Sequence, residues 1–423
     1  MGLLVALGMH VPTALMACSF VGVWAIKGSP VLASKMLGLA ANDAISSYFF
    51  GVVPLFVLMG FVVSESGMAR DSFDVANAMF AKIKGGLGLG TIAGNTVFAA
   101  ITGISIASAA VFTKIAVPEM RRHGYSARFS VGLVAGSSVL GMLIPPSLLL
   151  ILYGLLTEQS IGDLFIAGVG PGLLLALLFG LGTLVMAYFT PNFVGKNLGQ
   201  RDAQFSAGEL LQKGLPITLL IGLVLGGIYG GWFTPVEAGA IGTTIALILG
   251  FARGRLTLGR LWSVLIDTGL VTASVCFLII AAQMYSRMLA FSHIPAVVGD
   301  LFTSLDIGLM ALLLIYLLLV ILFGMILDSS SILLILVPLM LPIIQPLGVD
   351  LVWFGIITII AVEIGLLTPP FGLSVFVIKS TLNDPEVTLA HIFTGAAPFA
   401  LMMLICLGAV LAFPFISLGF LGR

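Results

Sequence analysis

Two pairs of consecutive prolines interrupt long apolar stretches of the sequence, Pro145-Pro146 in GMLIPPS and Pro369-Pro370 in GLLTPPFG. Proline lacks a backbone N–H and clashes with the preceding turn, so two in succession unwind a helix. Unwinding leaves carbonyl oxygens unpaired, which is costly in lipid. A sodium ion can satisfy these hard oxygens, and the Thr368 hydroxyl adds a ligand. The helix that restarts after each pair points a positive dipole end at the same place. A simple proline kink is the alternative for each motif.

Small polar residues interrupt two further apolar stretches. Helix capping explains some of their hydroxyls without any ligand. Asp328 is harder to explain in this way, because a carboxylate between two apolar arms needs a partner or a ligand. The first group lies in and around TGIS and comprises Asn95, Thr102, Gly103, Ser105 and Ser108. The second is the run DSSS and comprises Asp328, Ser329, Ser330 and Ser331.

Three other ionisable residues lie within apolar segments. Arg287 could donate two hydrogen bonds to a substrate carboxylate, or extend to the outer headgroups. Glu237 follows Thr234-Pro235 at an expected helix start, where a carboxylate complements the helix dipole, so capping is favoured. Glu363 precedes Gly365 by two residues and is expected to brace the second proline pair.

Enzyme signatures are absent from the sequence: there is no Walker loop, no HExxH, no nucleophile elbow and no paired CxxC. The run GGLGLG leads into an apolar hairpin and not from a strand into a helix, so it does not indicate a phosphate loop. Cys18, Cys276 and Cys406 are far apart and are expected to be buried apolar residues. We therefore expect no catalytic residue and no cofactor, with sodium acting only as a coupling ion.

The elements that position these residues must cross a membrane. The chain is 60% hydrophobic and only 9% charged, with a mean hydropathy of +1.21, whereas soluble proteins carry roughly 25% charged residues. Its net charge of zero gives no indication of a nucleic-acid partner. Apolar stretches of about 20 residues, each enough to cross a bilayer, recur along the chain. They predict spans at 3–26, 45–63, 129–153, 165–189, 216–231, 236–251, 263–291, 353–378 and 392–418.

The stretches 91–117 and 307–344 are too polar at their centres for plain spans and are expected to be re-entrant hairpins. For the second, two ordinary helices joined by a wet loop is the alternative. This layout places 14 of the 18 Lys and Arg residues on one side, which the positive-inside rule makes cytoplasmic. Those on the cytoplasmic side are Arg70, Lys82, Lys84, Lys114, Arg121, Arg122, Arg128, Lys196, Arg201, Lys213, Arg253, Arg255, Arg260 and Lys379; Lys27, Lys35, Arg287 and Arg423 lie on the other.

Conformationally constrained residues coincide when the sequence is shifted by 224 residues. Because the two hairpins open from opposite sides, the copies predict an inverted-topology repeat, which is typical of secondary transporters. Duplication retained for packing alone is the alternative. The matching positions are Pro118 with Pro342, Gly124 with Gly348, Gly141 with Gly365, Pro145-Pro146 with Pro369-Pro370, and Ser105 with Ser329.

Several motifs together resemble the large membrane subunit of tripartite ATP-independent periplasmic (TRAP) transporters, the DctM type: PLFVLMG, AGNTVFAAITGISIAS, VPEM, GMLIPPS, FTPVEA and EIGLLTPPFGL. The similarity runs from about residue 3 to residue 418. It implies a sodium-driven elevator transporter for organic acids, multi-pass in the bacterial inner membrane. A small membrane (Q-type) subunit and a periplasmic substrate-binding protein are the partners that it implies, beside the lipid bilayer.

The resemblance also implies positions for the ions and the solute. A first sodium site would use Thr102, Gly103 and Ser105 with the stretch from Ser137 to Pro145, and a second would use Gly324, Gly365, Thr368 and the neighbouring Pro369 carbonyl. The solute would lie between the hairpin tips. The expected substrate-binding residues are Ser105, Asp328, Ser329, Arg287 and Asn95.

The sequence therefore predicts an all-α polytopic membrane protein of the elevator type, with two inverted repeats that each contain a re-entrant hairpin and a broken helix. Scaffold helices and an interfacial segment occupy 1–90, and the first transport repeat occupies 91–189. A linker and further scaffold helices occupy 190–306, and the second repeat with the last helix occupies 307–423. The predicted function is translocation in a sodium-coupled importer of a carboxylate-bearing solute. A single-component divalent-anion/sodium symporter and a passive ion channel are the alternatives.

Overall fold

The computed structural model describes residues 4–422 apart from 6, 196–204, 295–296, 298, 300–303 and 305–307, and every regular element in this part of the chain is helical. Seven of the described helices are long and apolar enough to cross a bilayer, or eight if a bent pair counts as one span. The predicted all-α polytopic class is confirmed. Outside the described residues lie Lys196, Arg201 and Arg423 of the predicted charge layout, and the first residues of the span 3–26 and of the hairpin 307–344.

The amino-terminal part of the chain forms α2 and α3, which belong to an arm of the structure, and then a bent pair of helices. Pro30 opens the second helix of the arm, and Ser29 caps it by accepting the Leu32 N–H. The sequence prediction missed this helix and began the next span too early, because Lys35 and Asp43 lower its hydropathy. The elements are α2 (Val11–Lys27), α3 (Pro30–Ser46), a 3-10 turn (Tyr48–Gly51), α4 (Val52–Glu65) and α5 (Met68–Phe80), with α4 and α5 bent by 66°.

The first segment, residues 86–194, folds as a helical hairpin followed by a broken helix, as predicted. The hairpin turns at Gly103, whose positive φ of 62° suits glycine. The broken helix stops before Pro145 and restarts after Ser147, whose hydroxyl caps the new helix. The elements are α6 (Gly86–Thr102), α7 (Ser105–Arg122), α8 (Ala127–Ser138), α9 (Leu140–Leu143), α10 (Leu148–Thr157), α11 (Ile161–Phe189) and α12 (Pro191–Val194).

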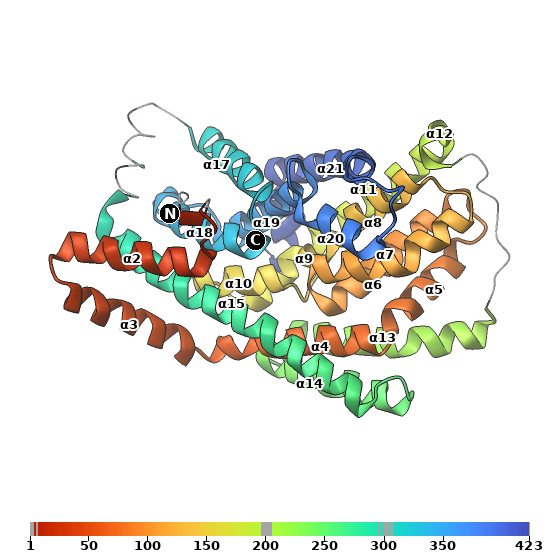
Figure 1. The fold of residues 1–423 in the computed structure, drawn as a ribbon, viewed down its shortest axis with the longest axis horizontal. Helices are drawn as coiled ribbons and strands as arrows, with labels where there is room; N and C mark the ends of the chain where they lie inside the picture. Colours follow the sequence, from red (N-terminus) through yellow and green to blue (C-terminus); the bar gives the residue numbers. More distant parts are fainter. Residues whose placement is uncertain are drawn as a thin grey trace.

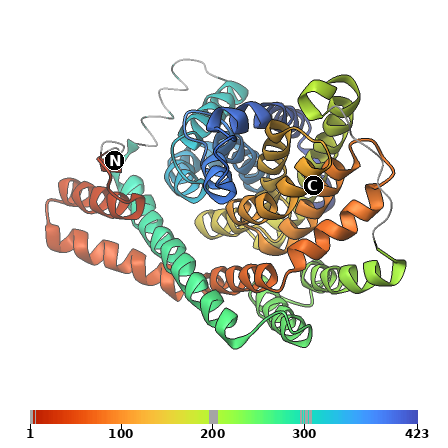
Figure 2. The ribbon, with the colours of Figure 1, turned by 45° about the vertical axis from the view of Figure 1, so that its right-hand side comes forward.

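Three long helices form the middle of the chain. Glu237 closes a capping box with Thr234 at the start of one of them, which confirms the expected capping role. The longest, α15, packs along α2, α3 and α4, and Figure 2 shows it with α2 and α3 as an arm beside the remaining bundle. The elements are α13 (Ala207–Tyr229), α14 (Pro235–Ala252) and α15 (Leu258–Ser292).

The second segment, residues 309–421, also begins with a helical hairpin that is followed by a broken helix. The helix after the hairpin turn begins at Ser105 in the first segment and at Ser329 in the second, and the next begins at Ala127 and at Leu351. Both pairs are 224 residues apart, the spacing found in the sequence. The opposite membrane orientation of the two segments stays a prediction. The elements are α17 (Leu309–Gly324), α18 (Ser329–Ile344), a 3-10 turn (Gln345–Leu347), α19 (Leu351–Leu367), α20 (Leu373–Leu382), α21 (Leu389–Ala412), α22 (Phe415–Leu418) and a 3-10 turn (Gly419–Leu421).

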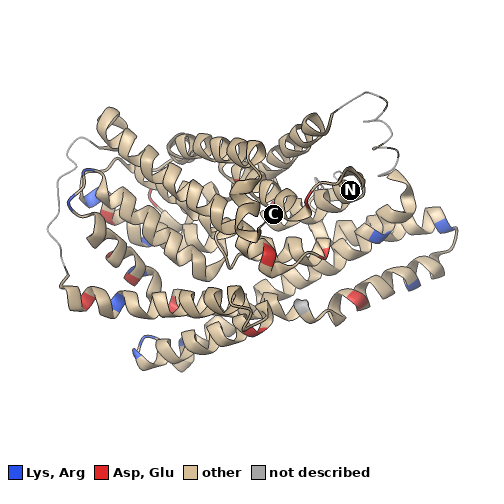
Figure 3. Ribbon diagram, turned by 180° about the vertical axis from the view of Figure 1, so that it is seen from behind, with Lys and Arg blue, Asp and Glu red and all other residues tan. Residues whose placement is uncertain are grey.

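Figure 1 shows α2 and α3 at one end of the long axis and α5 and α12 towards the other. Lys and Arg residues lie mostly towards the two ends of this axis, and the band between them is almost free of them (Figure 3). The broken helix Ala127–Thr157 is the most enclosed span, with 89% of its apolar window buried, whereas α13 has only 28%. The first break therefore lies in the interior of the bundle.

Candidate functional site

The tip of the first hairpin rests directly on the first proline break. The Leu148 N–H, at the restart of the broken helix, donates to the Gly103 carbonyl at 3.0 Å. A Cβ at Gly103 would lie 2.4 Å from the Pro146 carbonyl oxygen, so only glycine permits this approach. The Thr102 hydroxyl, at the end of α6, donates to the Phe98 carbonyl at 3.1 Å. The turn thus supplies a backbone acceptor, the Gly103 carbonyl, to the helix that restarts after the break.

The tip of the second hairpin meets the second break in the same way. The N–H groups of Phe371 and Gly372 donate to the Met325 carbonyl at 3.3 and 3.4 Å. Gly324 and Gly365 bring two helix ends into backbone contact, because a Cβ on Gly365 would lie 2.5 Å from the Gly324 Cα. The three glycines predicted to take part, Gly103, Gly324 and Gly365, therefore lie at the two breaks.

Hydroxyl groups satisfy part of the broken backbone. Ser147 donates to the Met142 carbonyl at 2.5 Å and accepts the Leu150 N–H at 3.3 Å. The Thr368 hydroxyl donates to the Ile364 carbonyl at 2.7 Å, which leaves its oxygen lone pairs available to a cation. Pro145 and Pro369 lie within the unwound segments, as predicted.

Asn95 connects the first hairpin to the broken helix. Its amide donates to the Ser137 hydroxyl at 2.8 Å, and its carbonyl oxygen accepts the Ser108 hydroxyl. All three side chains are fully buried. The predicted role of Asn95 in substrate binding stays a prediction, and in this arrangement the side chain ties α6, α7 and α8 together.

Glu363 is the point where both hairpin tips meet one ionisable group. The Ser329 hydroxyl, at the start of α18, donates to Glu363 Oε1 at 3.1 Å. Ser105, at the start of α7, also lies close to this carboxylate, but neither the Ser105 hydroxyl nor Glu363 Oε2 has a hydrogen-bond partner. Glu363 is 2% exposed. The sequence associated Glu363 with the second break alone, whereas the structure places it between the two tips.

Asp328 lies apart from this cluster. It caps α18 by accepting the Ser331 N–H at 3.1 Å and the Ser331 hydroxyl at 2.5 Å. Asp328 and Ser331 line a cavity of about 620 Å³ together with His10, Thr13 and Ser274, the last from the middle of α15. This cavity lies between the second hairpin and the scaffold helices.

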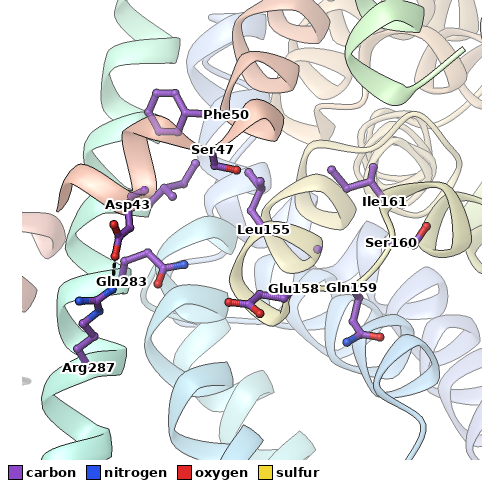
Figure 4. A pocket seen from close by; sticks show the side chains of 13 residues that line it. Asp43, Ser47, Phe50, Leu155, Glu158, Gln159, Ser160, Ile161, Gln283 and Arg287 are labelled. Carbon is purple, nitrogen blue, oxygen red and sulfur yellow. Dashed lines mark hydrogen bonds and ion pairs between the residues drawn. The ribbon is translucent and has the colours of Figure 1, made fainter. Parts of the chain in front are cut away.

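Arg287 lines a second cavity, of about 500 Å³, between α3, α15 and the turn from α10 to α11. It forms an ion pair with Asp43, and Gln283 and Glu158 point into the same space (Figure 4). Sequence reasoning missed Asp43, because the helix that carries it was not expected. The structure therefore brings Ser105 and Ser329 together but places Asp328 and Arg287 in two separate cavities.

The two breaks differ in their exposure. Every residue from Leu143 to Ser147 is buried, whereas Pro369, Pro370 and Phe371 are exposed, the last by 53%. The first break is thus enclosed and the second is open at the surface of the bundle. Among the described residues no group of three or more His, Cys, Asp or Glu side chains could hold a metal ion, so the candidate ligands are hydroxyl, carboxylate and backbone oxygens.

Comparison with known proteins identifies the family. Residues 1–416 match the family described as tripartite ATP-independent periplasmic transporter, DctM component. The chain is 34% identical to the C4-dicarboxylate TRAP transporter large permease protein DctM of Pseudomonas aeruginosa, over 91% of this chain and 88% of that one. It is 31% identical to the sialic acid TRAP transporter large permease protein SiaM of Vibrio cholerae, over 90% and 87%.

A solved structure supports the fold independently. The YdaH transporter of Alcanivorax borkumensis superposes with a TM-score of 0.65 at 17% identity, covering 92% of this chain and 89% of that one. The matched relatives are transporter permeases, which fits a multi-pass protein of the inner membrane whose breaks and tips lie among its spans. The chain belongs to the DctM family, the large permease component of TRAP transporters.

Proposed function

We propose that the chain is the translocating subunit of a sodium-coupled symporter that imports a carboxylate-bearing solute. The observation that carries this proposal is the docking of each hairpin tip on a proline break by backbone hydrogen bonds, Leu148 on Gly103 and Gly372 on Met325. Non-helical backbone at membrane depth is tolerated where it lines a cavity or binds an ion. Two such places, at matching positions of two similar segments, are the arrangement expected of a transporter.

The coupling ions bind at the two breaks in this proposal. Unwound carbonyls and helix carboxyl ends coordinate sodium in transporters of this construction. The first ion takes oxygens from the Thr102–Ser105 turn and from the broken helix. The second takes the backbone carbonyl oxygens of Gly324 and Gly365, which lie in contact, and the Thr368 hydroxyl. The proposed ligand-bearing residues are Thr102, Gly103, Ser105, Ser137 and Pro145 for the first, and Gly324, Gly365, Thr368 and Pro369 for the second.

The solute occupies the cavity beside Asp328 and Ser331. Its volume of about 620 Å³ suits a small organic acid, because ligand pockets commonly measure about 300–1,000 Å³. His10, Thr13 and Ser274 line this cavity with groups that can donate hydrogen bonds to a solute carboxylate. A carboxylate-bearing solute agrees with the dicarboxylate and sialic acid named for the two relatives.

The outer cavity at Arg287 provides the entrance. Its guanidinium sits beside Asp43 at the junction of the arm and the first transport segment, where it can receive an acid and pass it inwards. Transport then proceeds by an elevator movement of the two hairpins and broken helices against the arm. A small membrane subunit and a periplasmic binding protein that delivers the solute complete the proposed system, and the word tripartite in the family description supports this.

Uptake into proteoliposomes tests the proposal. The chain is reconstituted with both partners, and labelled acid uptake is measured with an inward sodium gradient, with equal sodium, and with potassium alone. Uptake should require the sodium gradient and both partners. Thr368→Ala should raise the sodium concentration for half-maximal uptake, while its thermal unfolding midpoint stays close to that of the wild type. Uptake by this chain alone would favour a single-component symporter. Currents that flow without the solute would favour a channel.

A further inference from the structure

Glu363 is a buried carboxylate that is not among the proposed sodium ligands at either proline break. It lies on α19 and is 2% exposed. Its one hydrogen bond is from Ser329, and within the described part of the chain no Lys, Arg or His forms an ion pair with it. A carboxylate at membrane depth needs a partner that matches its charge.

Two unpartnered oxygens lie at this carboxylate. Glu363 Oε2 and the Ser105 hydroxyl are both enclosed, and neither has a partner with good hydrogen-bond geometry, although the Ser105 hydroxyl lies close enough to interact with the Glu363 carboxylate. Buried polar groups in folded proteins nearly always have a partner, so each exception calls for an explanation. One ligand placed between the two hydroxyls and the carboxylate would satisfy both groups at once.

We infer that Glu363, Ser105 and Ser329 form a further sodium site that joins the two hairpin tips. The inference rests on the proposed sodium coupling and adds a third site to the two at the breaks. One carboxylate and two hydroxyls supply hard oxygens and a single negative charge, which a monovalent cation balances. Divalent cations such as calcium take 6–8 oxygens, often from several carboxylates, whereas no group of three or more His, Cys, Asp or Glu among the described residues could hold a metal ion.

The position of the site gives it a role in coupling. Ser105 begins the second helix of the first hairpin, and Ser329 begins the second helix of the second hairpin. An ion held by both would bring the two tips to the same carboxylate. The two segments would then move as one unit only when this ion is bound, which prevents solute from crossing without sodium.

The test compares Glu363→Gln with the wild type in proteoliposomes that contain both partners. Glutamine keeps the size of the side chain and its acceptor for Ser329 but removes the charge. The ratio of labelled sodium to labelled solute and the charge carried per solute are measured together. We expect Glu363→Gln to transport one sodium ion and one charge fewer per solute, with a less steep dependence of uptake on sodium. Glu119→Gln, at the far end of α7 where Glu119 lies near Arg122, is the matched control and should leave both ratios unchanged.

The outcomes separate this inference from the proposed function. Wild-type uptake that ignores sodium would overturn both. Sodium-driven wild-type uptake with unchanged ratios in Glu363→Gln would overturn the third site alone. Loss of one charge with no loss of sodium would show that a proton takes this place and would overturn the sodium assignment. If Glu363→Gln fails to insert, Ser329→Ala carries the test, because Ser329 belongs to neither site at the breaks: the variant should raise the half-saturating sodium concentration several-fold, and an unchanged value would overturn the inference.

Discussion

The contact between Gly324 and Gly365 offers the sharpest structural test of how the second hairpin meets its break. A Cβ added at Gly365 would lie 2.5 Å from the Gly324 Cα and 2.7 Å from the Ile321 carbonyl oxygen. Both neighbours are backbone atoms, so no side-chain rotation relieves the overlap. Gly365→Ala must therefore separate α17 from α19.

The cost of this separation follows from the kind of atoms involved. Overpacking a well-filled interior typically costs 1–3 kcal/mol, and a clash with backbone on two sides belongs at the upper end, about 3 kcal/mol. Gly408→Ala is the matched control, since Gly408 lies within helix α21 and a Cβ there would meet nothing within 4 Å. At that position alanine should stabilise the helix by up to about 1 kcal/mol.

Two measurements check the prediction. The thermal unfolding midpoint of each purified variant should fall for Gly365→Ala and hold or rise for Gly408→Ala. In proteoliposomes, the sodium concentration for half-maximal uptake should rise for Gly365→Ala alone, because the proposed second sodium site loses its geometry. A Gly365→Ala protein as stable and as sodium-responsive as Gly408→Ala would refute the close contact as a requirement.

Asp328→Asn should keep the cap on α18 and leave the unfolding free energy nearly unchanged, whereas Asp328→Ala should cost about 1 kcal/mol; both should lower solute uptake, and wild-type uptake in either would remove Asp328 from the solute cavity. Asp384, in the turn between α20 and α21, accepts the Glu386 N–H at 2.9 Å and pairs with Arg121, and these contacts hold the pKa of its carboxyl below the usual value. The stabilising contribution of Asp384 is therefore complete above the unfolded pKa of about 3.9 and is lost as the pH falls through the folded pKa. The difference in unfolding midpoint between the wild type and Asp384→Asn should be constant above about pH 5 and should vanish at lower pH. A difference that does not depend on pH would contradict this. Lys82→Cys and Leu309→Cys, before the first and second hairpins, should react with a membrane-impermeant maleimide from the cytoplasmic and periplasmic faces respectively, and labelling of both from one face would disprove the inverted layout.

Residues with restricted backbone conformations made much of the site predictable from sequence. Pro145-Pro146 and Pro369-Pro370 mark two real interruptions, and Gly103 marks the turn of the first hairpin. These residues act through their own backbone, so their consequences are local and do not depend on neighbours far along the chain. The same holds for Glu237, whose capping partner Thr234 is three residues away.

Contacts between distant segments were not predictable in this way. The ion pair of Arg287 with Asp43 joins residues 244 apart, and it depends on a helix of mixed composition that hydropathy did not indicate. The convergence of Ser105 and Ser329 on Glu363 depends on how three helices pack. A single sequence holds the types of these residues but not the packing angle that brings them together, since polar side chains at this depth can meet any of several neighbours.

The unequal exposure of the two breaks bears on how the two segments move. Both have the same order of elements at the same spacing, yet the first break is enclosed and the second is open. Two segments of one plan that adopt different surroundings can exchange them, and in an inverted repeat this exchange opens the opposite side of the membrane.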